Sequence, residues 1–138
     1  MTDRPLGRVR EQHGSVLISG LLLSLALLLL IGAAVDIGRA FIVHRELVSA
    51  ADDAALSGSQ ALDLTALHAG RLALDPRAAQ QAALQSLSDE PTLVGQAAAN
   101  TGSVEVHVQR RIETVLLRLV GVSSLTISAQ ATAAPRAP

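Results

Sequence analysis

The sequence predicts an α+β fold, in which a single transmembrane helix continues outward as a long amphipathic helix and leads into a small domain of helices and a two- to three-stranded sheet. Three observations support this prediction. Residues 15–35 carry no charge and include nine leucines. The residues that follow repeat apolar and small side chains at helical spacing. Two stretches near the C-terminus alternate apolar and polar residues as strands do.

These patterns divide the 138 residues into five segments. They are a basic head at 1–14, a transmembrane helix at 15–35, a helix extension at 36–62, a small exported domain at 63–133 and a disordered tail at 134–138. The apolar segment would span roughly 31 Å as a helix, which matches a hydrocarbon core of about 30 Å. The head holds three arginines and two acids, whereas residues 36–63 hold two arginines and five acids. This distribution predicts a cytoplasmic N-terminus and an exported C-terminal domain.

Two kinds of processing are open alternatives for the apolar segment. Cleavage by signal peptidase near Ala34, after a run of small residues, would release a small secreted effector or ligand. Cleavage on the cytoplasmic side, between Gly14 and Ser15, would leave the apolar helix on the mature protein. The helical pattern continues past Ala34 without a break, and this continuity favours retention in the membrane.

The helix extension carries one stripe whose members are spaced alternately four and three residues apart. The stripe consists of Ile37, Phe41, His44, Val48, Ala51, Ala55, Gly58 and Leu62. Small residues dominate it from Ala51 onward and allow close approach, so the stripe packs either on its own domain or on identical subunits. Asp36 is interpreted as a boundary charge, where the helix reaches water, rather than as the buried partner of an arginine.

The exported domain carries a clear helix signal near its start. Asp75 and Pro76 predict an N-cap followed by proline in the first turn, and Asp89-Glu90-Pro91 predicts the end of that helix. Its apolar face is Ala79, Ala83 and Leu87. No helix or strand is predicted for the residues between this helix and the turn at 100–102.

Two strands are predicted after that turn, with a short helix between them. The first has Val104, Val106 and Val108 inward, and the second has Leu125, Ile127, Ala129 and Ala131 inward. Helical spacing from Ile112 to Leu119, closed by Gly121, predicts the helix. About fifteen residues join the strands, which is enough for a crossover that would set them parallel.

The composition argues against several classes of function. Cysteine is absent, aromatic residues make up 1% of the chain, and the net charge is −1. The histidines at 13, 44, 68 and 107 lack metal-ligand spacing, and no nucleophile, base and oxyanion donor come together. We therefore expect no enzymatic activity, cofactor, metal site, nucleic-acid partner or small-molecule substrate. The alanine and arginine bias suggests a bacterial source.

The chain resembles the TadE/TadG-like family in its motifs. Gly14-Ser15-Val16 matches that family's "G-x-V" before the membrane helix, residues 34–39 match "AVDxGR", and residues 47–58 match "LQNAADAAALAG". Residues 104–133 resemble the closing "VxVxV…FxRLxG…VTVSAxAxA". The matching motif residues are Asp36, Gly38, Arg39, Ala51, Asp52, Ala54 and Ala55.

This resemblance implies a structural or assembly component of a tight-adherence (Flp-type) pilus or a related secretion system. The implied protein is single-pass, pseudopilin-like and located in the bacterial cytoplasmic membrane, with other pilus components or identical subunits as partners. Processed relatives carry a glutamate at the fifth residue after the cleavage glycine, where this chain has Ser19. We therefore expect no processing at Gly14. A short form is expected, without the von Willebrand-like domain of some members and without its metal site.

Overall fold

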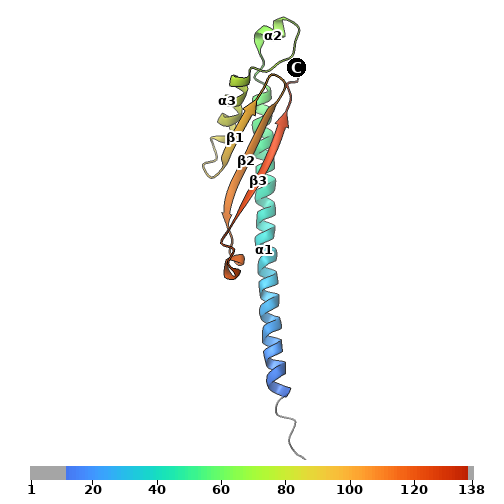
Figure 1. Cartoon of the computed structure of the whole chain (residues 1–138), viewed down its shortest axis with the longest axis vertical. Helices are drawn as coiled ribbons and strands as arrows, with labels where there is room; N and C mark the ends of the chain where they lie inside the picture. Colours follow the sequence, from blue (N-terminus) through green and yellow to red (C-terminus); the bar gives the residue numbers. More distant parts are fainter. Residues whose placement is uncertain (1–11, 137–138) are drawn as a thin grey trace, which may run out of the picture.

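The computed structural model describes residues 12–136 and has one long helix with a small domain packed against its C-terminal half (Figure 1). The elements are α1 (Gln12–Ser59), α2 (Leu64–His68), α3 (Pro76–Leu87), β1 (Val94–Ala99), β2 (Val104–Glu113), the 3-10 helix η1 (Leu117–Val120) and β3 (Ser124–Ala133). The α+β prediction is confirmed. The basic head up to residue 11 and the last two residues of the tail lie outside the described residues.

Helix α1 runs for 48 residues without interruption. The sheet and α3 lie beside its C-terminal half, and its N-terminal half extends away from the domain (Figure 1). No proline occurs between Gln12 and Ser59 to break the backbone hydrogen bonding. The apolar segment and the extension predicted from the sequence therefore form a single helix, which ends at Ser59 rather than at the predicted residue 62.

The three strands form an antiparallel sheet in the order β1-β2-β3. In the centre of β2, Val106 pairs with Ala97 on one side and with Ala131 on the other. The prediction of parallel strands joined by a crossover is wrong. Strand β2 continues through Ile112 to Glu113, so only residues 114–123 remain for the connection, and Thr114 N–H donates to the Ser123 carbonyl to close a hairpin.

Two other features of the sheet differ from the sequence pattern. Ile112 belongs to β2 rather than to a helix, and the helix after it is only the four-residue η1, capped by Gly121 at φ 94°. No strand was predicted at β1, because its segment is largely alanine and glycine, which are uncommon in strands. Pairing with β2, rather than local propensity, makes this segment a strand.

The core lies between α1, α3 and the inner face of the sheet, and it is built mainly from small residues. Its fully enclosed members are Leu47, Ala51, Ala54, Ala55, Leu74, Ala79, Ala83, Val104, Val106 and Val108. The predicted inner faces of α3 and β2 are confirmed. Because the core side chains are short, backbones approach closely: a Cβ on Gly58 of α1 would lie 2.8 Å from the Ala79 carbonyl oxygen of α3.

Capping aspartates fix where the two shorter helices begin. Asp75 Oδ1 accepts the N–H groups of Arg77 and Ala78 at 2.9 and 3.2 Å, and Pro76 follows it in the first turn. This confirms the predicted start of α3. Asp63 caps α2 in the same way.

Candidate functional site

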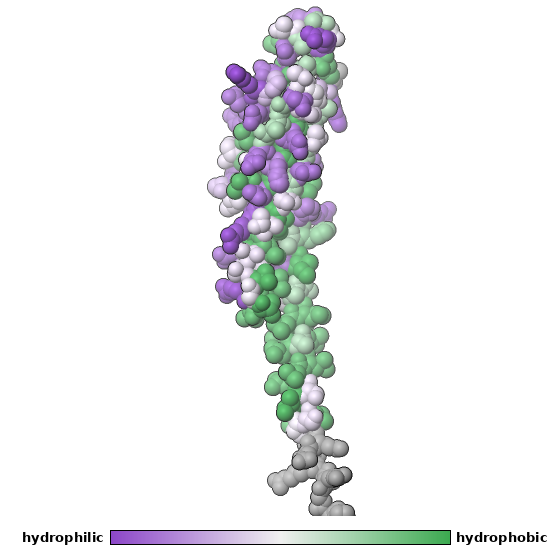
Figure 2. Space-filling model, viewed as in Figure 1, coloured by the Kyte–Doolittle hydropathy of each residue, from purple (hydrophilic) through white to green (hydrophobic). Residues whose placement is uncertain are grey.

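The N-terminal half of α1 presents an apolar surface on all sides. Leu21, Leu23 and Leu30 are 71%, 72% and 69% exposed, and the other large side chains of this segment except Leu29 are exposed as well. Figure 2 shows hydrophobic residues along most of this part of the helix, whereas polar and apolar residues are interspersed over the domain. Within the described residues, α1 is the one helix long and apolar enough to cross a membrane. A surface of this kind requires an apolar environment.

Asp36 stands directly after this apolar segment and is 2% exposed. Its Oδ1 accepts the Val115 N–H at 3.0 Å, and its Oδ2 accepts the N–H groups of Leu116 and Leu117, each at 2.8 Å. These hydrogen bonds, led by that of Leu117, lower the pKa of the Asp36 carboxyl below its usual value. The interpretation of Asp36 as a solvated boundary charge is wrong, because the carboxylate holds the β2–β3 loop against α1.

The same loop packs on the last turns of the apolar segment. Gly32 is buried, and a Cβ at this position would lie 2.6 Å from Leu116 Cδ1. Leu29, one turn earlier, is partly covered, although most of its neighbours are exposed. Helix α1 and the loop are therefore in contact both at Asp36 and along the turn that precedes it.

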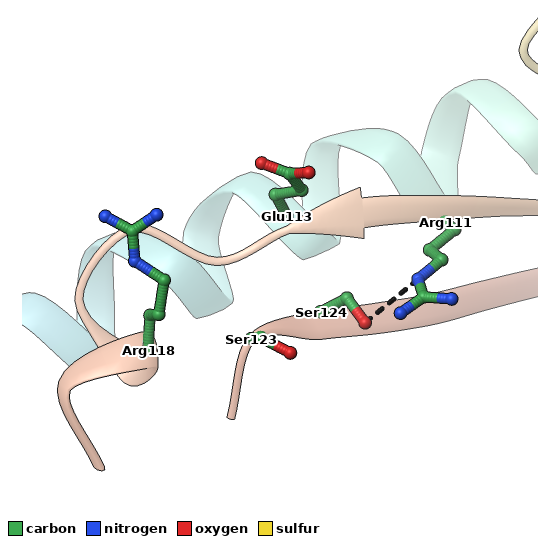
Figure 3. Close-up of a pocket in the computed structure, with 5 residues that line it drawn as sticks. All are labelled: Arg111, Glu113, Arg118, Ser123 and Ser124. Atoms are coloured by element: carbon green, nitrogen blue, oxygen red, sulfur yellow. Dashed lines mark hydrogen bonds between the residues drawn. The ribbon is translucent and has the colours of Figure 1, made fainter. Parts of the chain in front are cut away.

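A shallow pocket of about 270 Å³ opens beside this loop. It is lined by Arg111, Glu113, Arg118, Ser123 and Ser124 (Figure 3). Arg111 Nε donates to Ser124 Oγ at 3.0 Å, which ties β2 to β3. Arg118 belongs to η1 and lies beyond the end of β2. Glu113 lies between Arg118 and Arg111 (Figure 3). The pocket thus places two guanidinium groups and one carboxylate near the end of the sheet closest to the apolar segment.

The predicted stripe of the helix extension divides into two parts. Ala51, Ala55 and Gly58 are buried against the domain of the same chain, and Leu62, beyond the end of α1, is partly buried. Ile37, Phe41, His44 and Val48 are exposed. The buried face of α1 is rotated relative to the predicted stripe, and it continues from Asp36 through Leu47 and Ala54.

The exposed part of the stripe borders a groove. His44 and Val48 line it from α1, together with His107 of β2 and residues 128–130 of β3, around a volume of about 400 Å³. The groove combines apolar and polar side chains. Ile37 and Phe41 extend the same helix face toward the apolar segment.

The residues of the family motifs occupy different environments. Ala51, Ala54 and Ala55 are core residues, and Asp36 is the buried acceptor described above. Arg39 and Asp52 are exposed, and so is Gly38, where an added Cβ would meet nothing within 4 Å. Gly14 and Ser15 are exposed near the start of α1.

A second polar cluster joins three parts of the domain. Arg110 of β2 forms ion pairs with Glu46 of α1 and with Glu90, which follows α3. The arrangement links α1, β2 and the segment after α3. Among residues 12–136, no three histidine, aspartate or glutamate side chains gather as a metal site would require.

Sequence reasoning missed the contact between Asp36 and residues 115–117. The two segments are about 80 positions apart, and no local pattern connects them. A signal was present in the small residues Gly32 and Ala33, one turn before the acid, because they leave room for a neighbouring chain.

The comparison with known families finds a similarity over the N-terminal part of the chain. Residues 14–72 match the family described as putative Flp pilus-assembly TadE/G-like. This match confirms the resemblance to the suspected family over the N-terminal motifs, and it covers α1 from Gly14 onward, α2 and the first residues after it. Neither a curated protein nor a solved structure matches the chain.

Proposed function

We propose that this protein is a single-pass component of a tight-adherence pilus or a related secretion apparatus, with a structural or assembly role in the bacterial cytoplasmic membrane. The family match over residues 14–72 supports pilus assembly. The observation that carries the membrane assignment is the bare apolar half of α1. A soluble protein would bury that many leucines, whereas a bilayer accommodates them over a length of about 31 Å.

The continuous helix supports retention rather than secretion. Cleavage near Ala34 would cut α1 inside its ordered length, two residues before Asp36. The chain would also lose Gly32, on which Leu116 packs. An intact anchor keeps the domain at a fixed position above the membrane, as a scaffold component of an assembly requires.

We propose that other components of the apparatus, or identical subunits, contact the exposed face formed by Ile37, Phe41, His44 and Val48. Two of these are large apolar side chains without cover in the monomer, and they lie on a helix just above the proposed span. Aromatic side chains such as Phe41 are enriched at protein–protein interfaces relative to the rest of the surface.

Mass spectrometry of the mature protein, purified from membranes and from culture medium, tests the proposal. We expect a membrane-bound protein that retains residues 15–35, with an intact N-terminus. A mature protein starting at Val35 in the medium would establish the secreted alternative. A start at Ser15 that disappears in Gly14→Leu would make the protein a processed pilin, and Ala34→Leu serves as the matched control because it blocks only signal peptidase.

A further inference from the structure

We propose that the β2–β3 loop, residues 114–123, inserts into the outer leaflet of the membrane, so that the lipid surface is its binding partner. The inference rests on the proposed membrane anchoring of α1 and adds a second contact between protein and bilayer. It follows from the position of the loop, its exposed side chains, its backbone hydrogen bonds and its charges.

The position of the loop follows from its contacts with α1. Leu116 packs on Gly32, so the loop lies alongside a residue that belongs to the apolar segment. Gly32 precedes Val35 by three residues, or roughly 4.5 Å along a helix. Interfacial protein segments bury themselves about 5–10 Å into the boundary between headgroups and acyl chains. A bilayer that covers residues 15–35 therefore also covers the tip of this loop.

The loop exposes apolar side chains where a solvated hairpin connection would be polar. Val115, Leu119 and Val120 are 54%, 72% and 59% exposed, and Val122 is also exposed. Figure 2 shows that the hydrophobic surface of the lower helix continues onto the adjacent end of the domain. The continuity of the two apolar surfaces favours one common environment, the lipid, over a separate partner.

Most backbone N–H groups of the loop donate hydrogen bonds within the protein rather than to solvent. The N–H groups of residues 115–117 donate to Asp36, and that of Thr114 donates to the Ser123 carbonyl. Leu119, Gly121 and Val122 donate to carbonyls inside the loop, and the Thr114 hydroxyl donates to the Val122 carbonyl. Non-helical backbone is tolerated at membrane depth only when its polar groups are satisfied by protein in this way.

The charges near the loop fit the headgroup layer. Arg118 is exposed beside the apolar tip, and Arg111 lies further along β2, away from α1's apolar segment (Figure 3). Arginine binds phosphate through two parallel N–H groups and extends its stem along apolar surface. Arg118 would thus contact lipid phosphates while Leu119 and Val120 enter the acyl region.

Depth-dependent fluorescence quenching of the full chain in phospholipid vesicles tests the inference. The protein has no cysteine, so single variants accept the fluorophore NBD at one chosen site. Leu119→Cys reports on the loop, Leu28→Cys on the transmembrane segment, and Ser103→Cys on the far β1–β2 turn. We expect lipids carrying a nitroxide near the headgroup to quench most of the emission at 119, and aqueous iodide to quench little of it. Position 103 should show the reverse.

The control positions separate failure of the inference from failure of the anchoring. Quenching by lipid at 28 but not at 119, with iodide reaching 119, would overturn loop insertion and leave the anchor intact. Loss of lipid quenching at both positions would overturn both. Protection of 119 from lipid and iodide alike would place a protein partner on the loop and would also contradict the inference. In an Asp36→Ala background we expect weaker lipid quenching at 119 and unchanged quenching at 28.

Discussion

Asp36 accepts hydrogen bonds from three successive backbone N–H groups, as the capping residue of a helix does, but its donors belong to a distant segment. We expect Asp36→Asn to accelerate hydrogen exchange at the amides of residues 115–117, since an amide side chain has one acceptor oxygen and turns an N–H group toward the others. Asp36→Ala should accelerate it further. Asp52→Asn, on an exposed residue of the same helix, is the control and should leave exchange at these amides unchanged.

The lowered pKa of Asp36 also predicts how the loop depends on pH. The folded state favours the carboxylate, so its contribution to stability is fully present above the usual pKa of 3.8. It is lost as the pH falls through the lower pKa of the folded protein. Protection of residues 115–117, measured by hydrogen exchange between pH 7 and pH 2, should therefore fall only below about pH 4, and this step should be absent in Asp36→Ala. A loss of protection near pH 6 would contradict this account.

Two glycines of α1 should respond to alanine in opposite directions. At Gly58 an added Cβ would lie 2.8 Å from the Ala79 carbonyl oxygen and 3.0 Å from Val104 Cγ1. We expect Gly58→Ala to destabilise the domain by about 1–3 kcal/mol through overpacking. Gly38→Ala has open space and should stabilise the helix by about 0.5–1 kcal/mol. Thermal unfolding in detergent micelles measures both, and equal effects would show that α3 does not approach α1 closely at Gly58.

At the scale of elements, the packing of α1 on the sheet separates buried from solvated positions on opposite sides of the same turn. Ala51 is fully enclosed and Ser49 is exposed. An unpaired charge in the core costs roughly 3–5 kcal/mol, so Ala51→Glu should unfold or strongly destabilise the domain. Ser49→Glu should change the free energy of unfolding by less than about 0.5 kcal/mol. Limited proteolysis and thermal unfolding distinguish the two variants.

The exposed face of α1 should matter for assembly rather than for folding. We expect Phe41→Asp to leave the melting temperature of the domain unchanged, because the ring has no cover in the monomer. It should weaken chemical crosslinking to neighbouring subunits or components in intact cells, since a carboxylate would be buried in the proposed contact. Asp53→Asn, on an exposed residue of the same helix, is the control. Unchanged crosslinking of Phe41→Asp would place the contact elsewhere.

At the scale of the whole molecule, the distribution of arginines predicts which side of the membrane holds the domain. We expect alkaline phosphatase fused after Ala133 to be active, because the enzyme folds only outside the cytoplasm and the arginine-bearing head precedes the apolar segment. A reporter that works only in the cytoplasm should stay silent at the same position. The opposite pair of results would reverse the proposed topology.

The sequence predicted the features that depend on neighbouring residues. The long helix, the Asp75 cap of α3 and the alternation of β2 and β3 follow from local periodicity and capping chemistry. The pairing direction of β2 and β3 and the existence of β1 depend on contacts between segments, and local patterns left the first wrong and the second unassigned. The role of Asp36 was missed for the same reason, since its partners lie far along the chain.

The absence of a break in α1 has a mechanical consequence. The part of the helix above the apolar segment, residues 36–59, is roughly 36 Å long, and the domain is packed along it. Transmembrane helices are tilted by about 20° on average, and such a tilt would displace the C-terminal end of this segment sideways by about 12 Å. A neighbouring protein that changes the tilt of the helix within the bilayer would thus displace the entire domain. A sideways force on the domain would in turn exert a torque on the transmembrane segment.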